Sequence, residues 1–192
     1  FFNQDIQKKV TKQTEIEIEI RKSIVDNEFI LYYQPIVDCS GKIIGAEALI
    51  RWQHPEKGLI PPMDFIPIAE ETKTIIDIGK WAFKEVCNQL KKWASEFKIY
   101  VSVNFSTIEF DSPHFIEMIK KTIEETGFSY FEHLKIEITE TNAMYNFEEN
   151  VRKILELKEL GIDTFIDDFG IGYSSLSYLK KLPVNTFKVD KL

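Results

Sequence analysis

The sequence predicts an α/β barrel, because strand-like and helix-like segments alternate along its 192 residues after an initial hairpin. Two further observations support this fold class. Polar residues gather toward the carboxyl ends of the strand-like segments, where α/β barrels build their active sites. No glycine-rich phosphate loop follows the first strand-like segment, which argues against a dinucleotide-binding sheet of the Rossmann type.

The composition is that of an ordinary folded domain. Hydrophobic residues make up 44% of the chain and charged residues 29%, a balance typical of a globular protein and not of a disordered one. A chain of this length suits one domain with a substantial core. The net charge of -7 argues against binding of nucleic acid polymers, whereas a group of carboxylates would attract cations.

The cysteine content and the hydropathy bear on the location of the protein. The two cysteines, Cys39 and Cys87, do not form a CxxC pair, so neither a disulfide framework nor a thiolate zinc site is expected. The sequence contains no run of the roughly 20 apolar residues that a membrane-spanning helix requires. We therefore expect a cytoplasmic protein, or the cytoplasmic part of a membrane-anchored one.

The first part of the chain reads as a helix. Residues 3–25 are rich in charge, and a single apolar stripe runs through them at Ile16, Ile20 and Ile24. We assign residues 1–27 to an N-terminal helix or linker that leads from an upstream domain, and residues 28–192 to the barrel domain. The chain opens within the helix and without an initiator methionine, which is the reason for expecting an upstream domain.

The next segments predict a hairpin. Strands are expected over 29–38 and 43–52, with a tight turn at Ser40 and Gly41 between them. The two strands must be antiparallel, because a parallel crossover needs about a dozen residues. A loop is expected over 54–62.

The remaining segments alternate helices with four further strands. The strands are expected over 99–106, 134–140, 163–170 and 186–190. The helices are expected to be a short one from Asp64, a long one from Ile75 to Phe97, one that starts at Asp111 or Ser112 with Pro113, one between a capping box of Asn146 with Glu149 and the C-cap Gly161, and a last one from Tyr173 to Lys181. This count gives six strands, whereas α/β barrels have eight strands and about 250 residues. We therefore expect the last two strands to be missing, and either the native chain to continue past Leu192 or a neighbouring chain to cover the gap.

One face of the expected strands is apolar and the other is polar. Strand side chains alternate between faces, so Glu47 and Arg51 lie on one face, and Ala46 and Ala48 lie on the opposite face. Five hard oxygen ligands stand on the polar side or at strand ends: Glu47, Asn104, Glu137, Asp167 and Asp168. Such ligands suit Mg²⁺ and Mn²⁺, and the strand ends carry no histidine that would indicate a zinc hydrolase. Any single one of these residues is better explained by a solvated strand end, but the five together favour a metal centre.

Other polar residues have two readings each. Lys188 would orient a water or a phosphate oxygen, or would pair with one of the adjacent aspartates. Arg51 has a guanidinium fork that suits phosphate, or forms a surface salt bridge. Residues 167–176, DDFGIGYSSL, suit a mobile segment over the site or a plain glycine turn. Glu140 alternates away from Glu137, so it is expected to hold this loop instead of a metal ion.

The same residues carry a family resemblance. The sequence strings that carry it are EALIRW (47–52) after YYQPIVD, VNFS (103–106), EITET (137–141), DDFGIGYSSL (167–176) and LPVNTFKVD (182–190). In order and spacing they resemble the motifs of the EAL domain family, the cyclic di-GMP phosphodiesterases, from about Glu28 to the end of the chain. The resemblance implies a TIM-like (β/α)8 barrel with an antiparallel first strand. It also implies hydrolysis of cyclic di-GMP to linear pGpG with two Mg²⁺ or Mn²⁺ ions.

The resemblance implies a role for each matching position. The positions that match metal ligands are Glu47, Asn104, Glu137 and Asp167, with Asp168 serving the second ion. Lys188 matches the lysine that positions the attacking water, so that Glu47, Asp168 and Lys188 form the implied catalytic set. Gln34 and Arg51 match substrate-binding positions, and Glu140 matches the glutamate that braces the loop at 167–176.

The resemblance also implies partners and leaves one alternative open. It implies a homodimer through the loop region at 167–176 and an upstream GGDEF or sensory domain in the same protein. The alternative is a catalytically inactive receptor that binds cyclic di-GMP and signals through that loop. Receptors of this kind usually lose metal ligands, whereas this chain keeps each one that it is long enough to contain, which favours the enzyme. Small departures from the family pattern are Ile171 in place of Thr and Asn185 in place of Asp.

Overall fold

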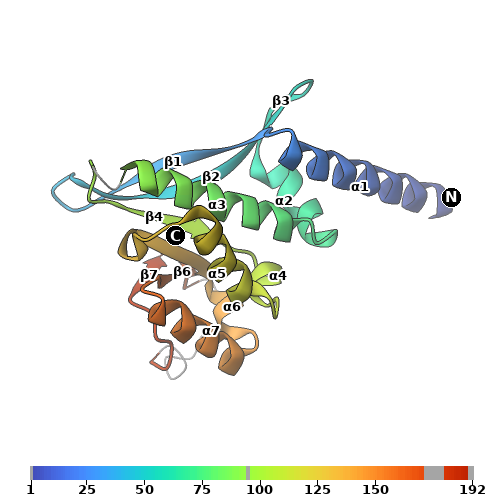
Figure 1. Ribbon diagram of the computed structural model, residues 1–192. Helices are drawn as coiled ribbons and strands as arrows, with labels where there is room; N and C mark the ends of the chain where they lie inside the picture. Colours follow the sequence, from blue (N-terminus) through green and yellow to red (C-terminus); the bar gives the residue numbers. More distant parts are fainter. Residues whose placement is uncertain (1, 94–95, 171–179, 190–192) are drawn as a thin grey trace.

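The strands form one sheet that is parallel except at its first edge. A computed structural model describes residues 2–93, 96–170 and 180–189, with side chains described from Thr14 onward (Figure 1). The strands are β1 (Phe29–Val37), β2 (Ile43–His54), β3 (Gly58–Ile60), β4 (Tyr100–Asn104), β5 (Leu134–Thr139), β6 (Asp163–Phe169) and β7 (Thr186–Val189). Their order in the sheet is β1-β2-β4-β5-β6-β7, with β3 beside β2. Strand β1 runs antiparallel to β2, and each later neighbour along this path is parallel, as the sequence predicted.

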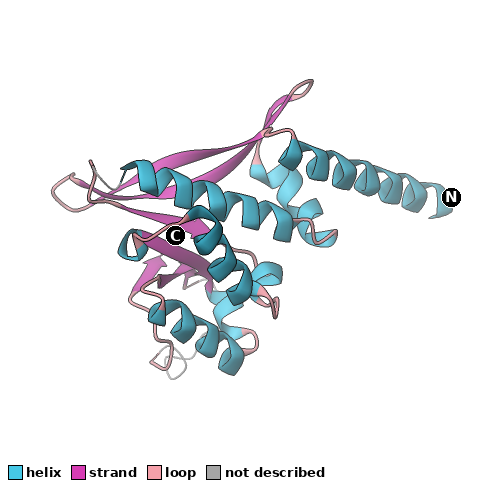
Figure 2. Ribbon diagram, viewed as in Figure 1, coloured by secondary structure: helices cyan, strands magenta, loops and turns pink. Residues whose placement is uncertain are grey.

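Helices α3, α5 and α7 cover a single face of this sheet. The helices are α1 (Phe2–Val25), α2 (Pro62–Glu71), α3 (Ile75–Trp93), α4 (Thr107–Phe110), α5 (Phe115–Thr126), α6 (Glu140–Met144) and α7 (Phe147–Glu159), with a 3-10 turn η1 (Phe131–His133) before β5. Helices α3, α5 and α7 lie side by side over the sheet, while α1 extends away from it (Figure 2). Within the described residues the sheet ends at β1 and β7 and does not close. None of the described helices has the length and apolar character needed to pass through a bilayer.

The main core lies between the sheet and these helices. The apolar side chains of the central strands alternate toward the helices, and those on β4 and β5 are at most 3% exposed: Val101, Val103, Leu134, Ile136 and Ile138. Helix α3 covers them with Phe83, Val86 and Leu90, which are at most 1% exposed. Burial of each such side chain contributes roughly 1.5–3 kcal/mol. The opposite face of the sheet is therefore free to carry polar groups.

A second core joins helix α1 to the carboxyl-terminal half of β2. Trp52 is 2% exposed and stacks on Phe29 with ring centroids 5.5 Å apart. Its indole Nε1 donates a hydrogen bond of 3.0 Å to Ser23 Oγ near the end of α1. Ile20 of α1 is fully buried in the same cluster. The last turns of α1 therefore pack on the barrel, and the division of the chain at residue 27 remains a prediction.

The structure corrects three expectations about local structure. The expected loop at 54–62 contains strand β3, because Gly58 adopts a positive φ of 71° and turns the chain back to pair with β2. Helix α3 does not reach Phe97, whose side chain is 50% exposed and does not continue the buried stripe. Asn146 has a φ of 43° and makes no side-chain cap, so the expected capping box before α7 is wrong.

Three other segments differ from the expectation or fall outside it. Helices α4 and α6 were not predicted. Helix α4 follows β4 directly, and its capping box pairs the Ser106 side chain with the Glu109 backbone and the Glu109 side chain with the Ser106 backbone. The expected helix from Tyr173 to Lys181 lies almost wholly outside the described residues, as does most of the loop at 167–176.

The polar face of the sheet contains a close contact near the base of the site. Gly45 on β2 faces the ring of Tyr100 on β4, and a Cβ at residue 45 would lie 2.5 Å from a ring carbon. The ring of Phe165 packs edge-on against the same tyrosine, with centroids 5.6 Å apart. Only glycine leaves room for this ring.

We expect Gly45→Ala to destabilise the fold by about 1–3 kcal/mol, because the added methyl group overpacks against Tyr100. Urea denaturation of the purified protein measures this loss. In a Tyr100→Ala background the same change should cost much less, since the ring that it meets is gone. Equal costs in both backgrounds would show that the contact does not limit residue 45.

The buried Glu109 predicts a pH-dependent stability. Its side chain is 5% exposed, and burial raises its pKa from 4.5 to about 7, against the opposing hydrogen bonds from Ser106 and with a smaller contribution from Glu70. The folded state therefore retains a proton that the unfolded state loses, so stability falls as the pH rises from about 4.5 to about 7 and then levels off.

We expect Glu109→Gln to remove this pH dependence, because a neutral amide keeps the cap without an ionisation. At pH 8 the variant should be more stable than the parent by about 1–3 kcal/mol. Urea denaturation at pH 5 and pH 8 measures the difference. Glu124→Gln, at an exposed position on α5, is the matched control and should leave the pH profile unchanged.

Candidate metal centre

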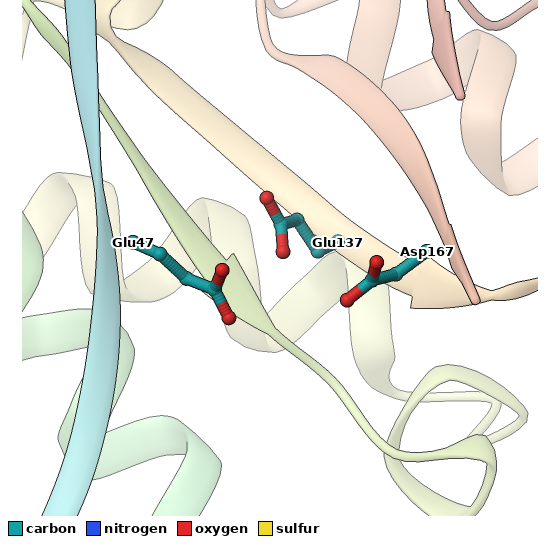
Figure 3. Close-up of side chains that lie close together, drawn as sticks. All are labelled: Glu47, Glu137 and Asp167. Atoms are coloured by element: carbon teal, nitrogen blue, oxygen red, sulfur yellow. The ribbon is translucent and has the colours of Figure 1, made fainter. Parts of the chain in front are cut away.

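Three of the expected metal ligands meet on the polar face of the sheet. Glu47 comes from β2, Glu137 from β5 and Asp167 from β6, and their side chains converge (Figure 3). One oxygen of each residue lies within 4.8 Å of an oxygen of each of the others. The residues meet because β2, β4, β5 and β6 are parallel neighbours, so their polar faces and carboxyl ends lie together.

Lys188 on β7 lies among these carboxylates. Its Nζ is 2.7 Å from Glu47 Oε2, 2.7 Å from Glu137 Oε2 and 3.6 Å from Asp167 Oδ2. Partial burial disfavours the ammonium, but its hydrogen bonds with Glu137 and Glu47 outweigh this and raise the pKa of Lys188. The ammonium therefore stays charged and ties β7 to three other strands, β2, β5 and β6. Pairing with Asp167, one reading of the sequence, is present together with the two closer glutamate contacts.

Glu137 is the most buried member of the cluster. Its side chain is 0% exposed, and burial raises its pKa, with the contact to Lys188 acting in the opposite direction. Its Oε1 is buried and has no hydrogen-bond partner among the described residues. A buried carboxylate oxygen without a donor is costly unless a cation binds it. This oxygen, together with the neighbouring carboxylates, fits a hard divalent cation.

Asn104 at the end of β4 orients Glu47. Its Nδ2 donates a hydrogen bond of 2.8 Å to Glu47 Oε1. Glu47 is thus held at both oxygens, by Asn104 on one side and by Lys188 on the other. Rotation of the Asn104 side-chain amide by 180° would place its oxygen where its nitrogen now lies. The oxygen is the atom of the amide that can bind a metal ion.

Asp168 is not part of the cluster that the described residues form. It adopts a positive φ of 56°, and its side chain is exposed. Its backbone N–H donates a 3.0 Å hydrogen bond to Asp167 Oδ1, which helps to fix the neighbouring carboxylate. Its expected roles in catalysis and in binding a second ion remain predictions.

The expected substrate-side residues lie near the same end of the sheet. Gln34 is paired with Glu47 in the register of β1 with β2, and its side chain is exposed. Arg51 donates to its neighbouring carbonyl, Ile50 O, at 2.7 Å, and its guanidinium lies 5.5 Å from the ring centroid of Tyr32. No salt bridge of Arg51 occurs among the described residues, so its alternative role as a surface ion pair has no support there.

Glu140 lies beside the end of β6. Its side chain is 3% exposed, and its Oε2 accepts a hydrogen bond of 2.8 Å from the backbone N–H of Gly170. This contact fixes the point at which the loop at 167–176 leaves the sheet. Glu140 starts helix α6 and is not among the cluster carboxylates.

Sequence reasoning overlooked one residue of the site. Ser102 on β4 is 0% exposed, lies opposite Glu47 in the register, and has a buried Oγ without a hydrogen-bond partner among the described residues. The period-two pattern had placed Ser102 on the polar face with Asn104, but a serine inside a strand gave no chemical reason to assign it a role.

Curated relatives share the whole length of this chain. The chain is 34% identical over 194 residues to the bifunctional diguanylate cyclase/cyclic di-GMP phosphodiesterase MucR of Pseudomonas aeruginosa, covering 100% of this chain and 28% of that protein. It is 33% identical over 192 residues to the cyclic di-GMP phosphodiesterase PdeR of Escherichia coli K12, covering 100% of this chain and 29% of that protein. The chain thus spans less than a third of the length of these relatives.

Solved structures show the same fold. The structure titled as the PaMucR phosphodiesterase in complex with c-di-GMP matches with a TM-score of 0.86 at 35% identity, over 92% of this chain and 72% of that one. The FimX EAL domain of Xanthomonas citri matches with a TM-score of 0.81 at 20% identity, over 97% of this chain and 72% of that one, which supports the fold alone. These are EAL domain structures, so the open sheet described above corresponds to part of a TIM-like barrel.

The family model of the EAL domain matches residues 17–192, which include every strand of the sheet and the three clustered carboxylates. This chain belongs to the EAL domain family.

Proposed function

We propose that this chain is the catalytic part of a metal-dependent phosphodiesterase that hydrolyses cyclic di-GMP to linear pGpG. The observation that carries the proposal is the cluster of Glu47, Glu137 and Asp167 around Lys188 on the polar face of the sheet. Relatives that match the whole chain are named cyclic di-GMP phosphodiesterases, and one matching structure is a complex with c-di-GMP.

The proposal gives each of these residues a role toward the metal ions, the attacking water or the substrate. Glu47, Asn104, Glu137 and Asp167, with Asp168 toward a second ion, would hold two Mg²⁺ or Mn²⁺ ions. Such ions supply a lowered pKa of bound water and offset negative charge on the phosphate when they are bound. Lys188 reaches the cluster from β7 and would orient the attacking water from beside it. The Arg51 guanidinium would hold a phosphate oxygen, and Gln34 would contact the substrate beside it.

A receptor without catalysis is the alternative class. It would bind cyclic di-GMP at the same end of the sheet and signal through the loop at 167–176. The retained cluster, with its buried and unpartnered Glu137 Oε1, favours the enzyme, because a receptor has no need of a costly carboxylate cluster with a completely buried member.

The partners of the domain follow from the relatives. MucR carries a diguanylate cyclase activity as well, as its name states, which supports an accompanying GGDEF domain upstream of residue 1 in this protein. A sensory domain in that place and a homodimer formed through the region of 167–176 are further parts of the proposal. Glu140 would brace that region through Gly170. We further propose a cytoplasmic location, where the second messenger acts.

We expect Glu47→Gln to lower metal-dependent hydrolysis of cyclic di-GMP by at least about 100-fold, because the amide removes a charged ligand and the partner of Lys188. Chromatographic separation of cyclic di-GMP from pGpG with Mn²⁺ present measures the rate. The protein under test is the full-length one that carries this domain. Glu117→Gln on the exposed side of α5 is the matched control and should keep the parental rate.

Two results would each contradict a different part of the proposal, the first the role of Glu47 and the second the catalytic activity. A Glu47→Gln variant with the full Mn²⁺-dependent rate would remove Glu47 from the catalytic machinery. Tight binding of cyclic di-GMP by the parent protein in Mn²⁺, without any pGpG formed, would instead establish the receptor.

A further inference from the structure

Lys188 occupies the middle of the carboxylate cluster. Its Nζ is 2.7 Å from Glu47 Oε2, 2.7 Å from Glu137 Oε2 and 3.6 Å from Asp167 Oδ2. These are the same three residues whose oxygens lie close enough together to bind one ion. A cation bound by those oxygens would lie against the ammonium, and two positive charges at that separation repel strongly. The present position of Lys188 and a metal ion in the cluster therefore exclude one another.

The cluster needs a cation in order to persist. Its three carboxylates carry three negative charges within 4.8 Å of one another, and the Glu137 side chain has no exposure to water that would screen its charge. Like charges this close disfavour ionisation and push their strands apart. The Lys188 ammonium offsets one of the three charges and contacts all three groups, so it stabilises the cluster when no metal ion is present.

Lys188 is also placed to leave the cluster. Its side chain is 27% exposed, compared with 0% for Glu137. A lysine side chain has a flexible four-carbon stem, so its ammonium can move toward solvent without any change in the strand.

We propose that Lys188 is a built-in cation that holds the metal centre together in the metal-free protein and competes with the metal ion for Glu47, Glu137 and Asp167. Metal binding then requires the ammonium to move aside, and the affinity for the metal is lower than the carboxylates alone would give. This role is separate from the orientation of water. It rests on the proposed function, because it concerns the same metal centre.

The test is calorimetric titration of Mn²⁺ into the chelator-treated protein, without nucleotide. We expect Lys188→Met to bind Mn²⁺ about tenfold more tightly than the parent, since the competing charge is gone. Lys188→Gln, which keeps a polar tip without a charge, should behave in the same way and guards against a packing effect of methionine. Lys158→Met, at an exposed position on α7, is the control and should leave the affinity unchanged.

Thermal unfolding gives a second readout. In chelator, both Lys188 variants should unfold at a lower temperature than the parent, because the carboxylates have lost their cation. Saturating Mn²⁺ should raise the unfolding temperature of these variants by more than it raises that of the parent. If Lys188 had only a structural role, its substitution would lower the unfolding temperature equally in chelator and in Mn²⁺.

The outcomes separate this proposal from the proposed function. Mn²⁺ affinity that is unchanged or weaker in both Lys188 variants overturns the competition, even if the parent hydrolyses cyclic di-GMP. Tighter binding in both variants supports it, even if the parent shows no hydrolysis and the phosphodiesterase assignment fails. If neither the parent nor the variants bind Mn²⁺, both proposals fail together.

Discussion

The ion cluster of Glu47, Glu137 and Asp167 with Lys188 is the feature that the rest of the structure must stabilise. It brings charge from four strands to one place, and one of its carboxylates is completely buried. Such an arrangement is unfavourable by itself, because desolvation of ions costs more than an imperfect pair returns. The sheet must therefore supply enough apolar burial on its other face to hold the strands in register.

That burial comes from the alternation of side chains along each strand. On β4 and β5 every second residue is apolar and packs under α3, α5 and α7, while the residues between them face the site. The same strand thus contributes to stability and to chemistry with opposite faces. Gly45 shows how closely the two are linked, since the lack of a side chain there admits the Tyr100 ring below the carboxylates.

Hydrogen bonds from uncharged groups fix the side chains and the backbone around the cluster. Asn104 holds the second oxygen of Glu47, and the Asp168 backbone N–H holds Asp167. Glu140 fixes the exit of the chain from β6 by binding Gly170. These hydrogen bonds leave Glu137 Oε1, a buried oxygen of the most buried carboxylate, without a partner among the described residues. A protein that binds a cation at this point gains from such an arrangement.

Sequence reasoning was most successful where a short-range rule applies. The antiparallel start followed from the short connection at Ser40 and Gly41, and the convergence of carboxylates followed from strand alternation. It was wrong where the backbone depends on its surroundings. Asn146 was assigned a cap from its residue type, but the chain adopts a left-handed conformation there, and β3 forms because β2 continues past Trp52 and offers a free edge.

The sequence by itself determined the fold class, the polar face and the candidate oxygen ligands, because period-two alternation and side-chain chemistry are local properties of the chain. Only the tertiary structure decided which of these residues meet. Glu47 and Lys188 are separated by 141 positions, yet their side chains lie 2.7 Å apart. The order of strands in the sheet brings them together, while the local backbone of β6 leaves Asp168 outside the cluster, next to Asp167 within it.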